Sequence, residues 1–141
     1  MVDKTNVRGY RNCNPLNIER GQNWKGLRQV QTDSRFCQFE SMLFGLRAAL
    51  VIIRNYIKGN NGTHRPLDTI EKIINRWAPP KENRTSAYVA TVSKEVGYDM
   101  RLRVKWEDRA LVCAIVKAMA KVETGITFDI KEVYSAYDLL S

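Results

Sequence analysis

The sequence predicts a mainly α-helical, α+β fold in which a small N-terminal β-hairpin region is followed by four to five helices. From residue 41 onward, apolar residues recur at steps of three and four, and capping residues flank most of these stretches. Residues 1–40 are instead rich in Asn, Arg, Gly and Gln. All connections are short, so we expect one domain over residues 1–141.

The predicted hairpin pairs two β-like runs, Leu27–Gln31 and Arg35–Phe39. The polar triplet Thr32-Asp33-Ser34 separates them and is typical of a turn.

The first long helix is predicted between Ser41, a good N-cap, and Gly59, a typical C-terminal stop. A second begins at Asp68, which forms a capping-box pattern with Glu71, and ends at Pro79 and Pro80. The apolar residues that define these two faces are Leu43, Leu46, Leu50, Ile53 and Ile57, then Ile70, Ile73, Ile74 and Trp77.

Three more helices complete the prediction. Asn83 or Thr85 caps the third, which Gly97 closes, and Asp129 caps the short last one. The fourth, about 107–123, is the most apolar, so we expect it near the centre of the fold. Its predicted buried residues are Leu111, Val112, Ile115, Val116, Met119 and Val122.

Composition narrows the possible functions. The net charge of +8 favours anionic partners such as nucleic acid, a membrane surface or an acidic cell-wall polymer. The single histidine, His64, argues against Ser-His and Cys-His catalysis, and the three cysteines have no metal-binding spacing, so we expect no cofactor. No apolar run approaches a membrane span, and the polar N-terminus predicts cytoplasmic synthesis without a signal peptide.

Two segments combine aromatic rings with amide or acid groups outside the apolar stripes. One holds Asn14, Asn17, Glu19 and Trp24, and the other runs from Trp77 through Glu82 to Tyr88. Rings beside hydrogen-bonding groups suit sugars or nucleobases. We therefore predict a cleft between these segments, with Asn14, Asn17, Trp24, Trp77 and Tyr88 binding the substrate.

The motifs of both segments resemble those of a known family. N-x-N-P-x-N-I, W-x-G, F-x-x-F-x-S and G-x-R-A are followed by W-A-P-P and E-N-x-T-x-x-Y-V, and the resemblance covers about residues 9–125. This pattern resembles the lysozyme-like proteins of phages and prophages, described as virion structural proteins or peptidoglycan hydrolases, and more distantly the glucosaminidase group. The resemblance implies a lysozyme-like fold, peptidoglycan or a related anionic glycan as partner besides other virion proteins, and association with the virion or delivery to the cell wall.

This chain departs from the family at two positions, where Leu16 replaces a common Gly and Glu19 a basic or neutral residue. Lysozyme-like enzymes also carry their catalytic Glu on a helix before the hairpin region, and only eight residues precede Gly9 here. The acid must therefore come from another position or be absent.

Glycosidic cleavage, by a hydrolase or a lytic transglycosylase, requires a carboxylic acid that protonates the leaving oxygen. We predict Glu19 as first and Glu82 as second candidate for this role. Asp33, Glu40 and Glu123 are further acids, and Glu123 is notable because a carboxylate near a helix C-terminus opposes the helix dipole.

Two alternatives stay open. A non-catalytic virion structural protein would lack a buried carboxylate in its main cleft. A basic nucleic-acid-binding helical module is disfavoured, because no predicted helix carries dense Lys and Arg on one face.

Overall fold

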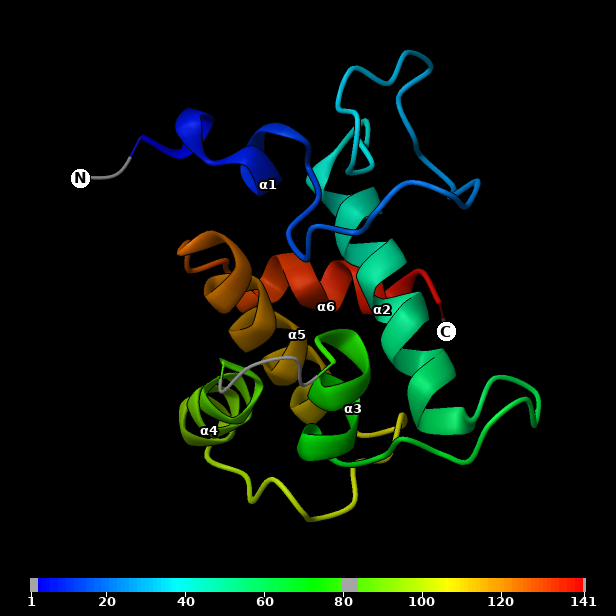
Figure 1. Cartoon of the computed structure of the whole chain (residues 1–141), viewed down its shortest axis with the longest axis vertical. Helices are drawn as coiled ribbons and strands as arrows, with labels where there is room; N and C mark the ends of the chain where they lie inside the picture. Colours follow the sequence, from blue (N-terminus) through cyan, green and yellow to red (C-terminus); the bar gives the residue numbers. More distant parts are fainter. Residues whose placement is uncertain (1–2, 80–83, 141) are drawn as a thin grey trace.

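A computed structural model describes residues 3–79 and 84–140 of the chain (Figure 1). Its regular elements are, in chain order, the 3-10 helix η1 (Lys4–Asn6) and the helices α1 (Arg8–Arg11), α2 (Met42–Lys58), α3 (Ile70–Trp77), α4 (Arg84–Val96), α5 (Arg109–Thr124) and α6 (Ile130–Asp138). The prediction of a mainly helical protein is therefore confirmed.

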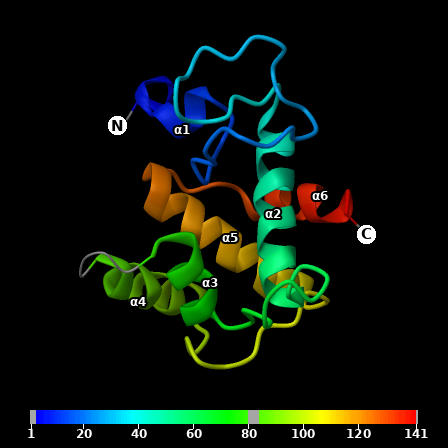
Figure 2. The same cartoon turned by 45° about the vertical axis from the view of Figure 1, so that its right-hand side comes forward.

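Two long helices organise the packing. Helix α2 extends from the N-terminal region to the opposite end of the molecule and contacts α3 and α6, as two views of the fold make clear (Figures 1 and 2). Helix α5 packs against α1, α4 and α6, in agreement with its predicted central position. In the described part of the chain, no helix is both long enough and apolar enough to cross a bilayer.

The predicted ends of α2 are confirmed. The Ser41 side chain accepts a hydrogen bond from the Phe44 amide, and Gly59 adopts a left-handed conformation with φ 78°. Asp108 caps α5, which Gly125 ends, and Asp129 caps α6. Short polar side chains satisfy the first amides of these helices, which have no partner within the helix itself.

Other predicted details are wrong or lie outside the described residues. Helix α3 is capped by Thr69, whose hydroxyl accepts from the Lys72 amide, whereas Asp68 forms an ion pair with Arg103 at 3.4 Å. Val122 is exposed on α5 instead of buried. Thr85 lies inside α4, where its hydroxyl donates to the Ala78 carbonyl. Pro80 and Asn83 belong to residues 80–83, outside the described residues.

The predicted β-hairpin is wrong, and with it the α+β class. Within residues 3–79 and 84–140 there is no strand, only two isolated antiparallel bridges, Glu19 with Phe36 and Leu27 with Phe39. The second bridge joins the two runs expected to pair, so the chain does turn back there. No ladder extends from that contact.

Side-chain hydrogen bonds supplement a few backbone hydrogen bonds in this region. The Gln38 Oε1 atom accepts from the backbone amides of Thr32 and Asp33, at 2.6 and 3.3 Å. The Asp33 Oδ1 atom accepts from the amides of Arg35 and Phe36, both at 2.9 Å. Such local side-chain bonds compete with sheet formation, which explains why the β-like pattern produces an irregular loop.

Gly45 allows the N-terminal region to rest directly on α2. A β-carbon at this position would overlap the Cys13 carbonyl oxygen and lie 3.1 Å from the Pro15 ring. Because residue 45 has no side chain, the N-terminal region can pack this closely against α2.

We predict that Gly45→Ala destabilises the protein by about 1–3 kcal/mol, because backbone must move to relieve the overlap. In an unobstructed helix the same change stabilises by roughly 0.5–1 kcal/mol. Urea unfolding of the wild type and Gly45→Ala measures the sign of the change in the free energy of unfolding. An increase would contradict the packing described here.

Candidate active site

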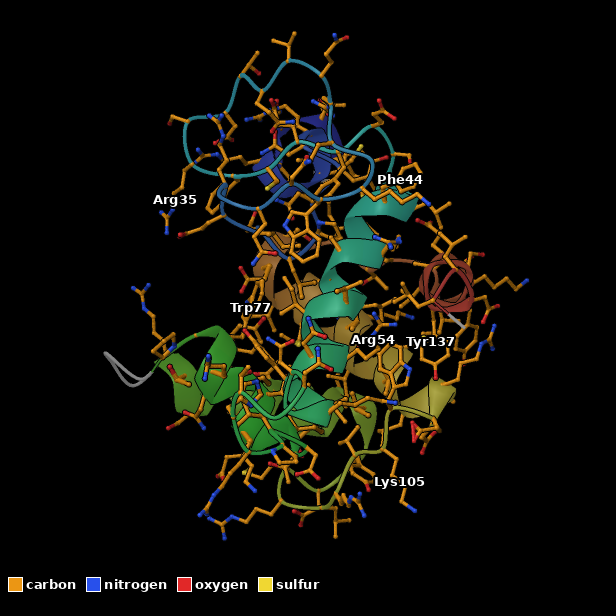
Figure 3. The ribbon with its side chains drawn as sticks, turned by 90° about the vertical axis from the view of Figure 1, so that its right-hand side faces the viewer. Arg35, Phe44, Arg54, Trp77, Lys105 and Tyr137 are labelled. Carbon is orange, nitrogen blue, oxygen red and sulfur yellow. The ribbon has the colours of Figure 1, made fainter. Side chains whose placement is uncertain are left out.

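A cleft of about 390 Å³ separates the N-terminal region from the end of α3. Figure 3 shows Arg35 on the N-terminal region and Trp77 on the helical part below it, on the same side of the molecule. The lining residues are Leu16, Asn17, Ile18, Glu19, Arg35, Phe36, Tyr56, Trp77, Ala78 and Glu123.

Glu123 contributes a half-buried carboxyl group to this cleft from the last turn of α5. The side chains of Tyr88, Asn17 and Trp77 hydrogen-bond to it. Burial raises the pKa of Glu123 above its ordinary value, and the three hydrogen bonds only partly offset that effect. A carboxyl group with a raised pKa in a cleft is suited to donate a proton.

The donors around Glu123 are neutral. Burial, followed by the charge of Glu123, raises the pKa of Tyr88, so its hydroxyl stays protonated and can donate. The Tyr88 oxygen also lies 3.4 Å from the Met119 carbonyl oxygen, a long contact compared with a bond to a carboxylate. Among the described residues, no cation lowers the pKa of Glu123, so desolvation dominates there.

The turn that presents Asn17 is held by Asn14. The Asn14 amide group donates to the carbonyls of Ile18 and Cys37 at 2.9 and 3.0 Å, and its oxygen accepts from the Ile18 amide at 2.9 Å. Asn17 itself has the left-handed φ of 52° that asparagine tolerates better than most residues. The local sequence therefore aims the Asn17 side chain at α5.

Helix α1 packs against the end of α5 through Gly9. An added β-carbon at Gly9 would lie 2.9 Å from the Thr124 Cγ2 atom and 3.0 Å from the Asn17 Oδ1 atom. The N-terminal region thus contacts both the residue that follows Glu123 and a residue that hydrogen-bonds to it.

The structure brings together some of the predicted site residues. Asn17, Glu19 and Trp77 line one cleft, and Tyr88 reaches it through Glu123. Asn14 is fully buried and bonded to backbone, so it has no free group for a substrate. Trp24 is not among the lining residues and packs instead at the edge of the core. Glu82 lies outside the described residues.

Glu19 lines the cleft in a different setting from Glu123. Its side chain is 64% exposed and paired with Arg35 at 3.0 Å. It is therefore a solvated, ion-paired carboxylate, whereas Glu123 is desolvated.

Sequence reasoning did not select Glu123, Phe36 or Tyr56 for the site. The unfavourable position of Glu123 at a helix C-terminus was the available signal. Phe36 belongs to the F-x-x-F-x-S motif, and Tyr56 lies within the first long helix that the sequence predicts. Nothing in the sequence therefore marks them as cleft residues.

A larger hollow of about 470 Å³ lies elsewhere, between the end of α2 and residues 103–107. Its charged lining includes the ion pairs Lys58–Glu107 and Arg103–Asp68, at 3.7 and 3.4 Å, so each of its acids has a cationic partner. In the described residues, no group of three or more His, Cys, Asp or Glu side chains could hold a metal ion. The chemistry therefore favours the smaller cleft.

Comparison with protein-family models finds no match. Among curated proteins, protein P5 of Pseudoalteromonas phage PM2 is 34% identical over 123 residues. The match covers 84% of this chain and 72% of the phage protein.

We predict that Glu123→Gln stabilises the fold at neutral pH. A raised folded-state pKa means that protonation stabilises the folded protein below about pH 4.5 and that this contribution is lost as the pH rises through the folded pKa. Glutamine stays neutral, so the free energy of unfolding of Glu123→Gln should exceed that of the wild type above about pH 4.5. This gain should level off beyond the folded-state pKa. Urea unfolding across the pH range measures this difference in the free energy of unfolding, with the exposed Glu95→Gln as control. A gain that does not change with pH would contradict the raised pKa.

We predict that Gly9→Ala lowers the free energy of unfolding by about 1–3 kcal/mol, because α1 must move away from Thr124 and Asn17. Loss of the Asn17 hydrogen bond should also raise the pKa of Glu123 further, since that bond lowers it. Asn17→Ala should reproduce the pKa change, measured by NMR titration of the Glu123 carboxyl carbon. If the pKa of Glu123 is unchanged in both variants, the packing of Gly9 against Asn17 does not affect the acid.

Proposed function

This chain belongs to the family of protein P5 of phage PM2, and on that premise we propose that it is a phage-associated protein that binds and cleaves glycan strands of the bacterial cell wall. The observation that carries the proposal is the desolvated carboxyl group of Glu123, with its raised pKa, in an open cleft. The resemblance of its motifs to those of lysozyme-like phage proteins supports peptidoglycan as the proposed substrate.

Glu123 is the general acid of the proposed reaction. Its proton is transferred to the bridging oxygen while the bond from that oxygen to the anomeric carbon breaks. The carboxylate that remains then takes a proton from the incoming nucleophile, which is water in a hydrolase or a hydroxyl of the same sugar in a transglycosylase. The acid must be protonated to start the reaction, so activity should fall as the pH rises through the pKa of Glu123.

The packing of α5 against the Asn-rich segment supports this assignment. Lysozyme-like enzymes carry the catalytic Glu on a helix that precedes the hairpin region in the sequence. Here the end of α5 packs against the corresponding Asn-rich segment, through Gly9 and Asn17. Glu123 therefore lies beside this segment at the end of a helix that follows it in the chain.

The walls of the cleft suit a sugar. Trp77, Phe36 and Tyr56 supply aromatic side chains, and Asn17 supplies an amide group. Apolar surface with a few placed polar groups is typical of ligand sites, and ring faces pack against the C–H faces of sugars. The basic net charge of +8 favours attraction to an anionic wall polymer.

We predict that Glu123→Gln lowers the rate of cleavage of purified peptidoglycan about 10²–10⁴-fold, because the proton donor is lost while shape is kept. Sedimentation with insoluble cell wall should remain at the wild-type level. The exposed, ion-paired Glu95 provides the matched control, and Glu95→Gln should cleave normally. Wild-type cleavage by Glu123→Gln would remove the acid assignment.

The same assay tests the earlier candidates and the reaction type. Glu19→Gln should keep cleavage, because an exposed ion-paired carboxylate is a poor proton donor. Loss of cleavage in Glu82→Gln would identify a second carboxylate, as hydrolases use. Mass spectrometry of the products separates reducing ends from intramolecular anhydro ends. A wild-type protein that sediments with wall but does not cleave it would favour the non-catalytic virion protein.

A further inference from the structure

Arg35 is an exposed cation at the edge of the cleft. Its Nε and Nη2 atoms both donate to the same Glu19 oxygen, Oε1, at 3.2 and 3.0 Å. Both side chains of the pair are 64% exposed. The guanidinium therefore does not engage the carboxylate as a fork with two parallel bonds, the stronger arrangement for this pair.

Neighbouring groups nevertheless hold the Arg35 guanidinium in position. It lies 4.8 Å from the centre of the Phe36 ring, which lines the cleft. The backbone amides of Arg35 and Phe36 both donate to the Asp33 carboxylate at 2.9 Å. A cation placed over a ring, on a backbone pinned by a neighbouring acid, is partly preorganised for binding.

A second arginine lies beside another aromatic ring of the cleft. The Arg76 guanidinium, on α3, lies 6.0 Å from the centre of the Tyr56 ring, which also lines the cleft. The acid inside the cleft, Glu123, has a raised pKa and so carries less negative charge than an ordinary glutamate. An anionic group that enters this cleft therefore meets the Arg35 cation and little opposing negative charge from Glu123.

We propose that Arg35 recognises a carboxylate carried by the glycan and that Glu19 is an exchangeable counter-ion, which the ligand's carboxylate displaces. The proposal rests on the proposed function, because it assigns the substrate class of the same cleft. Exposed ion pairs contribute little to stability, so breaking the Arg35–Glu19 pair is cheap. A free carboxylate can then form the forked pair that Glu19 does not form. Neutral glycans offer no group to make this exchange.

This arrangement predicts opposite effects for the two members of the pair. Arg35→Gln should weaken binding to carboxylate-bearing glycan roughly tenfold or more, since hydrogen bonds to charged groups are among the stronger ones. Glu19→Gln should strengthen binding, because the competing carboxylate is gone. Arg35→Lys should fall between wild type and Arg35→Gln, because it keeps the charge but loses the planar fork.

The experiment measures binding in a Glu123→Gln background, so that cleavage does not interfere. The probes are intact peptidoglycan, glycan strands stripped of peptide by an amidase, and both materials after amidation of their carboxyl groups. Stripped strands expose the lactyl carboxylate and intact peptidoglycan the carboxylates of its stem peptide, so the two arms distinguish the sources. Amidated material should bind more weakly, and the Arg35 and Glu19 substitutions should not affect its binding.

Arg101→Gln and Glu71→Gln are matched controls, because this exposed pair, at 3.9 Å, makes the same charge changes away from the cleft lining. Equal effects at both pairs would mean that only net charge matters and would overturn the proposal. Equal binding of native and amidated glycan by the parent protein would also overturn it. Thermal unfolding checks that each variant is folded. None of these outcomes depends on cleavage, so a failure here leaves the role of Glu123 to its own test.

Discussion

The N-terminal region depends on side chains that satisfy its backbone, and Asp33 is the most connected of them. Its carboxylate accepts five hydrogen bonds, two from the Arg8 guanidinium and one each from the Asn12 side chain and the amides of Arg35 and Phe36. Together with the backbone hydrogen bonds from the Arg20 amide to the Arg35 carbonyl and from the Cys37 amide to the Ile18 carbonyl, these bonds set the path of the loop that forms one cleft wall. The positions of Phe36 and Arg35 over the cleft follow from them.

Two acids in this small protein have opposite environments. The Arg8 guanidinium and the surrounding donors hold the pKa of Asp33 far below its usual range, so this acid stays ionised. Glu123 is desolvated with neutral partners, and its pKa is raised. The loop can therefore keep its structure under mildly acidic conditions in which Glu123 is protonated.

Much of the helical architecture could be predicted, because its signals are local. The apolar period of α2 and its flanking residues Ser41 and Gly59 define that helix without information from distant residues. The start of α3 was one residue off because Asp68 and Thr69 are both good caps, and the ion pair of Asp68 with Arg103 depends on the tertiary fold. The hairpin failed because alternation alone does not reveal whether Gln38 will bind the backbone in place of a strand.

The site was only partly predictable for the same reason. Both segments expected to form the cleft do line it, since Asn17 and Trp77 contribute side chains from either wall. The role of Glu123 depends on the approach of the N-terminal region to the end of α5, about a hundred residues away in sequence. Acid candidates ranked by their sequence neighbours therefore favoured Glu19, although its pairing with Arg35 leaves it solvated and ionic.

A purely structural role does not account for the setting of Glu123. A carboxylate in the last turn of a helix opposes the helix dipole, and its burial adds a desolvation penalty. A glutamine of similar shape would avoid both costs and could still accept hydrogen bonds through its single amide oxygen, although its NH2 group cannot accept. What the carboxyl group adds is a proton that can leave and return at a position open to the cleft. That distinction is the physical reason to regard Glu123 as a chemical group and Asn14, equally polar but bonded only to backbone, as a structural one.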